Sequence, residues 1–386
     1  MYSHASHGGG PPSTPAHPDA VARERPIAPV SARVGPAAEP HVDRRHDSGS
    51  KIRVAVIGAT GYAGGEVVRI LARHPAVEVV GLVGRNREGV PIDAVHAHLA
   101  ATDLVLDAAT PDADAYFLAL PHGLSAARVP SLLETGALIV DLGPDFRLHD
   151  PADYPRWYGF EHPAPELLAC SVYGLPEFHR TELAALAGAP IAIVGAPGCY
   201  PTAATLALAP LARAGLIDDV VVDAKSGVSG AGREPRADLT FAEVNESVRA
   251  YGVNGHRHTA EIEQELGRTG VDFLPHLVPM TRGILAAGHV RPTRPVLQAE
   301  LDALYAEAYA DEPFVRVVPE PPATGHVLGS NEARIFVRAN ERTGRVLAIG
   351  VIDNLVKGAA GQAVQAFNVV MGLPETTGLE HLPLAP

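Results

Sequence analysis

The sequence is poor in cysteine, short of positive charge and without a long apolar run. Its two cysteines cannot form a disulfide framework or a cysteine-rich zinc module, so a reducing, cytoplasmic setting is expected. No segment approaches the roughly 18 consecutive apolar residues of a membrane-spanning helix. The 44 Asp and Glu residues outnumber the 31 Lys and Arg residues, and the net charge of −13 argues against a general nucleic-acid binder. Local positive groups must therefore hold any anionic ligand.

The first 50 residues contain no leucine and are rich in proline, glycine and histidine. Their five basic and five acidic residues cancel, so the remainder carries the whole net charge. Such a segment buries too little apolar surface to offset its chain entropy, and we predict a disordered tail over residues 1–50. Its irregularly spaced histidines do not predict a metal site. The rest of the chain is long enough for two domains.

A glycine turn joins a short apolar strand to a helix near the start of the ordered chain. Residues 52–57 are apolar on both faces, as in a buried parallel strand, and residues 65–74 have a helical pattern. Glycines at such a turn let the backbone approach a pyrophosphate at the helix N-terminus. An ordinary strand-to-helix turn is the alternative, but the flanking elements favour a dinucleotide site. Its expected members are Gly58, Thr60, Gly61, Tyr62 and Gly64.

The second predicted strand, residues 77–83, leads to Arg85 in the region where dinucleotide folds recognise the ribose. An acidic residue there binds the hydroxyls of NAD, whereas an arginine meets the 2′-phosphate of NADP. Arg85 therefore favours NADP(H). Arg87 is an equally near alternative, and a solvated loop arginine is another.

Two further predicted strands, residues 115–120 and 137–142, end in polar loops. The carboxyl ends of parallel strands border the ligand crevice, so we expect Pro121 and His122 beside the cofactor. Arg147 has forked donors that match phosphate oxygens. A histidine satisfied by the backbone and an arginine paired with a neighbouring aspartate are the alternatives. The rest of the chain, from about residue 150, mixes strands and helices without regular alternation, which indicates an α+β domain.

One cysteine has the surroundings of a nucleophile. Cys199 follows Pro197 and Gly198 and precedes the helical run 203–214. Unpaired amides and the macrodipole at a helix N-terminus favour a thiolate, so we expect a pKa below the usual value of about 8.5. Cys170, in an apolar stretch, is interpreted as a buried structural residue.

A cysteine nucleophile needs an acid/base partner, and His256-Arg257-His258 offers two histidines. Residues two apart face different directions, so at most one is expected to point at Cys199, and we favour His258. Surface histidines at the start of a charged helix are the alternative.

The segment Gly195-Ala-Pro-Gly-Cys199-Tyr-Pro-Thr-Ala203 resembles the active-site signature of the N-acetyl-gamma-glutamyl-phosphate reductase family, a branch of the aspartate-semialdehyde dehydrogenase superfamily. Residues 58–64, 119–123, 226–233, 256–262, 275–283, 329–331 and 353–359 resemble the same family in the expected order. The resemblance covers residues 51–373. This chain differs from the family pattern at Gly143-Pro144, Ala260 and Gly325, which affects fine contacts rather than the reaction.

The resemblance implies a Rossmann-type α/β NADP-binding domain over residues 51–196 and 355–386, to which the final helix returns. An α+β catalytic and dimerisation domain is expected over residues 197–354. The implied activity is the NADPH-dependent reduction of N-acetyl-L-glutamyl 5-phosphate to the 5-semialdehyde, with phosphate release, in arginine biosynthesis. A cytoplasmic homodimer or homotetramer is expected.

The resemblance also implies roles for particular side chains. Cys199 would attack the acyl phosphate to give a thioester, which NADPH then reduces, and His258 would be the acid/base. The implied substrate-binding residues are Arg147, Arg233, Arg257, Arg282 and His256. The implied cofactor-binding residues, besides those named above, are Ser229, Gly230 and Asn354.

Two other functions stay open at this point. A reductase of aminoadipyl or glutamyl phosphate on an acidic carrier protein would need a basic docking surface, against which the net charge of −13 weighs. A non-catalytic NADP-binding sensor would leave Cys199 and the histidine pair without a role.

Overall fold

A computed structural model describes residues 43–45, 49–85 and 87–384 of the chain. Most of the tail predicted over residues 1–50 therefore lies outside the described residues. Residues 43–45 depart from that prediction, because Arg44 is buried against the fold. Its guanidinium donates to the carbonyl oxygens of Gly136 at 3.0 and 3.1 Å, Leu186 at 3.2 Å and Pro190 at 3.2 Å. These oxygens anchor a segment that has little apolar surface of its own.

The first sheet has six parallel strands in the order β2-β1-β3-β4-β6-β5. The strands are β1 (Ile52–Ile57), β2 (Val77–Val83), β3 (Ala115–Leu118), β4 (Leu138–Asp141), β5 (Ser171–Tyr173) and β6 (Ile193–Gly195). The chain leaves β1 for β2 on one side and later returns to β3 on the other. In open α/β sheets a ligand binds where the order reverses in this way.

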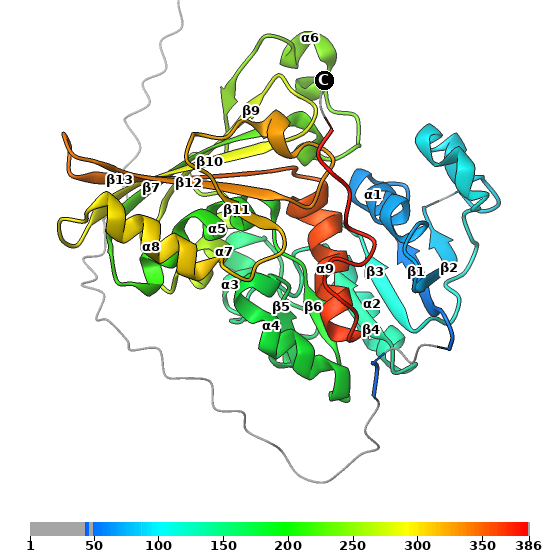
Figure 1. Cartoon of the computed structure of the whole chain (residues 1–386). Helices are drawn as coiled ribbons and strands as arrows, with labels where there is room; N and C mark the ends of the chain where they lie inside the picture. Colours follow the sequence, from blue (N-terminus) through cyan, green and yellow to red (C-terminus); the bar gives the residue numbers. More distant parts are fainter. Residues whose placement is uncertain (1–42, 46–48, 86, 385–386) are drawn as a thin grey trace, which may run out of the picture. The chain divides into compact units, whose positions relative to one another are not determined.

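Alternate residues of β1 pack on opposite faces of this sheet. Val54 and Val56 face a core shared by α1 (Tyr62–Leu71) and α9 (Gly361–Val370). Ala55 and Ile57 face a second core shared by α2 (Leu124–Leu133) and α3 (Asp153–Trp157). Figure 1 shows α9, near the end of the chain, lying beside the first sheet. The expected Rossmann-type α/β domain with a returning final helix is confirmed.

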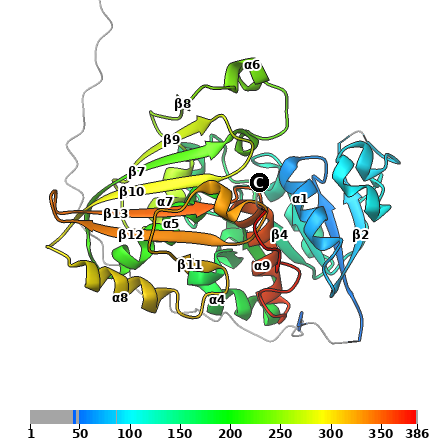
Figure 2. The same cartoon turned by 45° about the horizontal axis from the view of Figure 1, so that its top comes forward.

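The second sheet is mixed, with seven strands in the order β11-β12-β13-β10-β7-β9-β8. The strands are β7 (Ile217–Gly227), β8 (Arg249–Ala250), β9 (Asp272–Val278), β10 (Ile284–Pro292), β11 (Val315–Val317), β12 (Ala333–Asn340) and β13 (Arg345–Ile352). Strand β10 is antiparallel to both β7 and β13. Figure 2 shows most of these strands following one another across the sheet. The irregular pattern that predicted an α+β domain reflects this mixed sheet.

Three helices cover one face of the second sheet: α5 (Cys199–Arg213), α7 (His258–Leu266) and α8 (Gln298–Ala308). Helix α5 approaches β13 closely because β13 carries Gly350. A Cβ atom at Gly350 would lie 2.3 Å from the carbonyl oxygen of Ala203. Gly350 thus sets how closely α5, which begins with Cys199, packs on the sheet.

Further helices connect the elements of the two sheets. They are α4 (Pro176–Ala185), α6 (Phe241–Val244), a π-helix (Val356–Ala360) and 3₁₀ helices at Ile92–Ala94, Ala97–Thr102, Pro165–Cys170, Leu186–Gly188, Val228–Ala231, Ala237–Leu239 and Thr324–Val327. Within the described part of the chain, no helix has both the length and the apolar composition to cross a membrane.

We predict that Gly350→Ala lowers the free energy of unfolding by about 1–3 kcal/mol, because the added methyl group displaces α5. Urea unfolding measures this change. Gly325→Ala is the matched control, since a Cβ atom there meets no other heavy atom within 4 Å. Equal stability of the two variants would contradict the prediction.

Candidate active site

The turn that carries Cys199 connects the first sheet to the second domain. It leaves β6 at Gly195, and Cys199 is the first residue of α5. A Cβ atom at Gly198 would lie 2.6 Å from His258 Nε2. Only glycine therefore lets the histidine pack directly against the turn that carries Cys199.

His258 is the first residue of α7 and is buried. Burial, with the nearby positive groups of His256, Arg257 and Arg147, holds the pKa of His258 well below its ordinary value. The imidazole is therefore neutral at pH 7. Its Nδ1 atom has no hydrogen-bond partner within the described part of the chain.

The carboxylate of Glu261 connects the surrounding elements. One oxygen accepts hydrogen bonds from the Gly198 N–H at 2.8 Å and the Tyr173 hydroxyl at 3.0 Å. The other accepts from Arg147 at 3.2 Å and the Tyr158 hydroxyl at 3.1 Å, and lies 4.0 Å from His258 Nε2. Glu261 has no solvent exposure. Glu261, one helical turn after His258, thus connects the turn that carries Cys199 to Arg147.

Two neighbouring cavities meet at this point. A cavity of about 430 Å³ is lined by Cys199, His258, Arg147 and Arg257 together with the Tyr62–Gly64 part of the glycine turn. A larger one, of about 1230 Å³, is lined by the Gly58–Gly61 part. Gly61, Ala119, Leu120, Pro121 and Arg233 line both. A ligand on the glycine turn can therefore extend from one cavity into the other.

Two family models match the chain. One is described as semialdehyde dehydrogenase, NAD binding domain, over residues 53–186, and the other as semialdehyde dehydrogenase, dimerisation domain, over residues 199–354. An N-acetyl-gamma-glutamyl-phosphate reductase of Symbiobacterium thermophilum is 50% identical over 343 residues, which cover 85% of this chain and 97% of the relative. A reductase of the same name from Dehalococcoides mccartyi is 46% identical over 344 residues, which cover 87% of this chain and 99% of the relative. The chain belongs to the N-acetyl-gamma-glutamyl-phosphate reductase family.

Solved structures support the same fold. Aspartate semialdehyde dehydrogenase II from Vibrio cholerae matches with a TM-score of 0.63 and 18% identity, over 84% of this chain and 99% of that one. Aspartate semialdehyde dehydrogenase from Candida albicans, solved with NADP, matches with a TM-score of 0.58 and 14% identity, over 83% of this chain and 98% of that one. The resemblance to the semialdehyde dehydrogenase superfamily and the dinucleotide-binding domain expected from the glycine turn are both confirmed.

In this family member the backbone of the glycine turn folds tightly, and two of its positions have no room for a side chain. Gly58 has φ +93°, and a Cβ atom there would lie 2.2 Å from the carbonyl oxygen of Ala119. A Cβ atom at Gly64 would lie 2.2 Å from the carbonyl oxygen of Gly58. Thr60 lines the larger cavity and Tyr62 the smaller one. No side chain at the glycine positions blocks the path to the helix N-terminus, so the turn fits a dinucleotide.

Several arginines line the larger cavity. Arg85 and Arg87 both line it, so the structure leaves both candidates for the 2′-phosphate in place. Arg128 of α2 lines it too, on the same helix face as Leu124 and Ser131. The sequence analysis did not include Arg128, although its spacing from these neighbours along α2 is the signal that could have found it.

The other expected cofactor contacts lie in the smaller cavity. Ser229, Gly230, Asn354 and His122 all line it. The Asn354 amide donates to the Ser229 hydroxyl at 2.9 Å, and its oxygen accepts from the Gly283 N–H at 2.8 Å. The ring of His122 contacts Tyr158, and burial, then Arg257 and Arg147, lowers the pKa of His122 to about 4. His122 is thus a neutral group on the wall.

The predicted arginines differ in their surroundings. Arg147 donates to Glu261 and to the carbonyl oxygens of Leu142 and Ala196, both at 2.7 Å. It does not pair with Asp145, whose carboxylate accepts backbone N–H groups instead. Arg257 is exposed at the wall of the smaller cavity. Arg233 lines both cavities and donates to the carbonyl oxygens of Thr60 and Val95 at 3.1 and 2.8 Å.

Two of the residues predicted to bind the substrate lie outside the linings of these two cavities. Arg282 lines neither of these cavities, because its guanidinium pairs with the carboxylates of Glu66 and Asp353. His256 lines neither cavity either, because its ring packs against Tyr200 and its Nδ1 atom accepts the N–H of His258 at 3.1 Å. His256 therefore caps the start of α7.

The expected low pKa of Cys199 is also wrong. Burial raises the pKa of Cys199 to about 11, although Arg147 and the Tyr200 N–H act in the opposite direction. Cys199 is partly exposed at the cavity wall, but the loss of solvation among the surrounding protein atoms outweighs the helix N-terminus. At pH 7 the resting site holds a neutral thiol beside a neutral imidazole, so a proton must leave the thiol when it reacts.

We predict that alkylation of Cys199 by iodoacetamide, without cofactor or substrate, inflects well above pH 8.5. The thiolate forms only above the raised pKa, so the rate climbs steeply in the alkaline range. Mass spectrometry of the Cys199 peptide gives its rate separately from that of Cys170. An inflection at or below pH 8.5 would show that burial does not control this thiol.

Proposed function

We propose that this chain reduces N-acetyl-L-glutamyl 5-phosphate to N-acetyl-L-glutamate 5-semialdehyde with NADPH, releasing phosphate, as a step of arginine biosynthesis. The carrying observation is the arrangement of the smaller cavity. Cys199, His258 and three arginines line its wall, and it adjoins the cavity of the glycine turn through shared residues. A nucleophile, a proton acceptor and anion-binding groups thus lie beside a dinucleotide site. The named relatives are reductases of this substrate.

The chemistry begins with the thiol of Cys199. Its sulfur attacks the acyl carbonyl carbon, and its proton passes to the neutral imidazole of His258. The bond from the carbonyl carbon to the phosphate oxygen breaks, which leaves a thioester on Cys199 and free phosphate. A cysteine nucleophile divides one difficult step into two easier ones. When bound, NADPH supplies the hydride that reduces the thioester.

His258 and the turn complete the cycle. Hydride addition to the thioester leaves a thiohemiacetal alkoxide on Cys199, whose C–S bond breaks as its C–O bond becomes the aldehyde carbonyl. The sulfur leaves as a thiolate and recovers the proton that His258 holds. His258 packs against the Gly198 turn and lines the same cavity as Cys199, which supports its role in holding this proton.

Arg257 and Arg147 are the proposed anion-binding residues. Arg257 is exposed at the cavity wall. Three of the five N–H groups of Arg147 donate to described protein atoms, which leaves two for a phosphate or carboxylate oxygen. Arg233, which lies over the glycine turn, is placed to meet the ligand where the two cavities join.

Glu261 acts through these residues rather than on the substrate. Removing its charge leaves Arg147 without its carboxylate partner and weakens the bond that holds the Gly198 N–H. We predict that Glu261→Gln lowers kcat by about 10²-fold, the cost of misplacing reacting groups by about 1 Å. Steady-state kinetics measure this loss. Glu263→Gln is the control on the same helix, because among the described residues the hydrogen bonds that Glu263 accepts come from the backbone N–H groups of Gly270 and Val271, which line neither cavity.

Cofactor preference is proposed to depend on the arginines of the larger cavity. A bond between an arginine and a phosphate contributes about 1.5–3 kcal/mol, so losing one weakens NADPH binding by about tenfold or more. We predict that Arg85→Ala raises KM for NADPH by that factor and leaves KM for NADH nearly unchanged. Arg87→Ala and Arg128→Ala, measured in parallel, show which arginine carries the effect. Equal changes for both cofactors would contradict the assignment of Arg85.

We also propose that the protein is cytoplasmic and forms a homodimer or homotetramer. The family model of a dimerisation domain over residues 199–354 supports association. The face of the second sheet away from α5 carries an apolar cluster that includes Phe336, Ile349 and Val351. Sedimentation equilibrium distinguishes the two assemblies.

The reverse reaction tests the proposed function. NADP, phosphate and N-acetyl-glutamate semialdehyde are expected to yield NADPH with the wild type and not with Cys199→Ser. Inactive wild type that still binds NADP would favour the carrier-protein-linked reductase. A Cys199→Ser variant that keeps the function of the chain would favour the NADP-binding sensor.

A further inference from the structure

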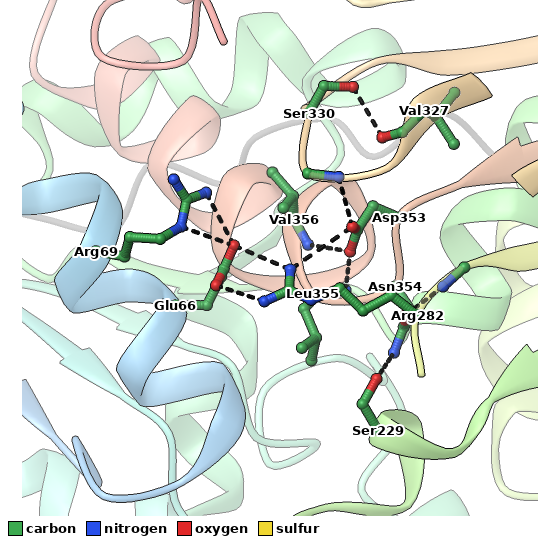
Figure 3. A network of polar contacts seen from close by, with 12 residues as sticks. Glu66, Arg69, Ser229, Arg282, Val327, Ser330, Asp353, Asn354, Leu355 and Val356 are labelled. Atoms are coloured by element: carbon green, nitrogen blue, oxygen red, sulfur yellow. Dashed lines mark hydrogen bonds and ion pairs between the residues drawn. The ribbon is translucent and has the colours of Figure 1, made fainter. Parts of the chain in front are cut away.

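A polar network joins the cofactor helix α1 to the end of β13 through Arg282. Glu66 follows Gly64 of the glycine turn by two residues and is 2% exposed. Arg282 donates to its two carboxylate oxygens at 2.9 and 3.2 Å, from a loop between β9 and β10. The same guanidinium lies 3.6 Å from Asp353, which follows β13. Figure 3 shows Arg282 between the two carboxylates.

The Asp353 end of this network supports the nucleophile. Its buried carboxylate accepts the N–H groups of Leu355 at 2.8 Å and Val356 at 3.2 Å, where the π-helix begins. That π-helix presents Gly358 to Cys199, and a Cβ atom at Gly358 would lie 2.8 Å from the Cβ of Cys199. Asp353 therefore fixes the segment that packs directly against the nucleophile.

The loop of Arg282 also contacts the wall of the smaller cavity. Gly283, the next residue, donates its N–H to Asn354, and Asn354 donates to Ser229. Figure 3 shows the contact between Asn354 and Ser229 near Asp353. One loop thus touches the cofactor helix, the cavity wall and the support of Cys199.

The ion pair between Arg282 and Glu66 resists separation of α1 from the Arg282 loop. Burial alone raises the pKa of Glu66, but hydrogen bonds from Arg282 and Arg69 bring it below its ordinary value, so Glu66 is ionised. Separating α1 from the Arg282 loop would leave a buried carboxylate with only one of its two cations. Arg69 comes from α1 itself and links Glu66 to no other element.

We infer that Arg282 is a positioning residue that sets the distance between a cofactor on the glycine turn and the acyl group on Cys199. This inference rests on the proposed function. Acylation of Cys199 needs only the smaller cavity, whereas reduction of the thioester also needs the correct spacing to the cofactor. Loss of Arg282 therefore slows reduction and leaves acylation intact.

Phosphate release without cofactor isolates the acylation step. Enzyme mixed with the acyl phosphate, in the absence of NADPH, forms the thioester and releases one phosphate per active site. We expect Arg282→Met and Arg282→Lys to give this burst at a rate within threefold of the wild type. Their NADPH-dependent kcat is expected to fall at least tenfold, less for lysine than for methionine.

An isotope effect identifies the slowed step. With NADPH deuterated at the transferred position, the effect on kcat is expected to rise in both variants, because reduction becomes rate-limiting. Arg69→Met is the matched control, since it removes a cation from the same carboxylate without breaking the link between elements. It is expected to keep kcat within threefold and the wild-type isotope effect. Thermal unfolding and NADPH titration by fluorescence accompany each variant.

The outcomes are distinct. Unchanged kcat and isotope effect in both Arg282 variants would overturn the inference. A burst that falls in parallel with kcat would also overturn it, because the effect would then lie on the acyl-phosphate side or on folding as a whole. Equal losses in Arg69→Met would show that the charge of Glu66, and not the link, matters. A wild type with neither burst nor turnover would overturn the proposed function and this inference with it.

Discussion

The arrangement of the reacting groups depends on one buried carboxylate. Glu261 accepts four hydrogen bonds, from a backbone amide, an arginine and two tyrosines, and these donors come from different segments of the chain. A charged group with no solvent exposure is stable only if its partners stay in place. Its position three residues after His258 therefore fixes the nucleophile turn, the proposed base and Arg147 relative to one another.

Loss of solvation also decides the protonation of Cys199 and His258. Burial raises the pKa of Cys199 and lowers that of His258, so the free enzyme holds a neutral pair. An imidazole without a proton on one nitrogen can accept the thiol proton when the sulfur attacks, which a histidinium cannot do. The raised pKa keeps the thiol of Cys199 protonated in the free enzyme, so proton transfer has to accompany any attack by the sulfur.

The two sheets share one site because the chain crosses between them more than once. The Cys199 turn leads out of β6 into the second domain, and the π-helix after β13 leads back to α9. At the second crossing, Asp353 and Arg282 link the support of Cys199 to Glu66 of the cofactor helix. The distance between the two halves of the site is therefore set by buried polar contacts as well as by apolar packing.

Local features of this protein could be predicted from its sequence, and features that depend on distant neighbours could not. The glycine turn, the paired apolar strands and the start of α5 at a cysteine are properties of short segments, so their patterns indicated both domains and the proposed nucleophile. The partner of Arg282 lies 216 residues away, and burial of Cys199 is the sum of contacts from several elements. Only the tertiary structure decided which arginines reach the cavity, that Glu261 connects the site, and that desolvation outweighs the helix N-terminus at the thiol.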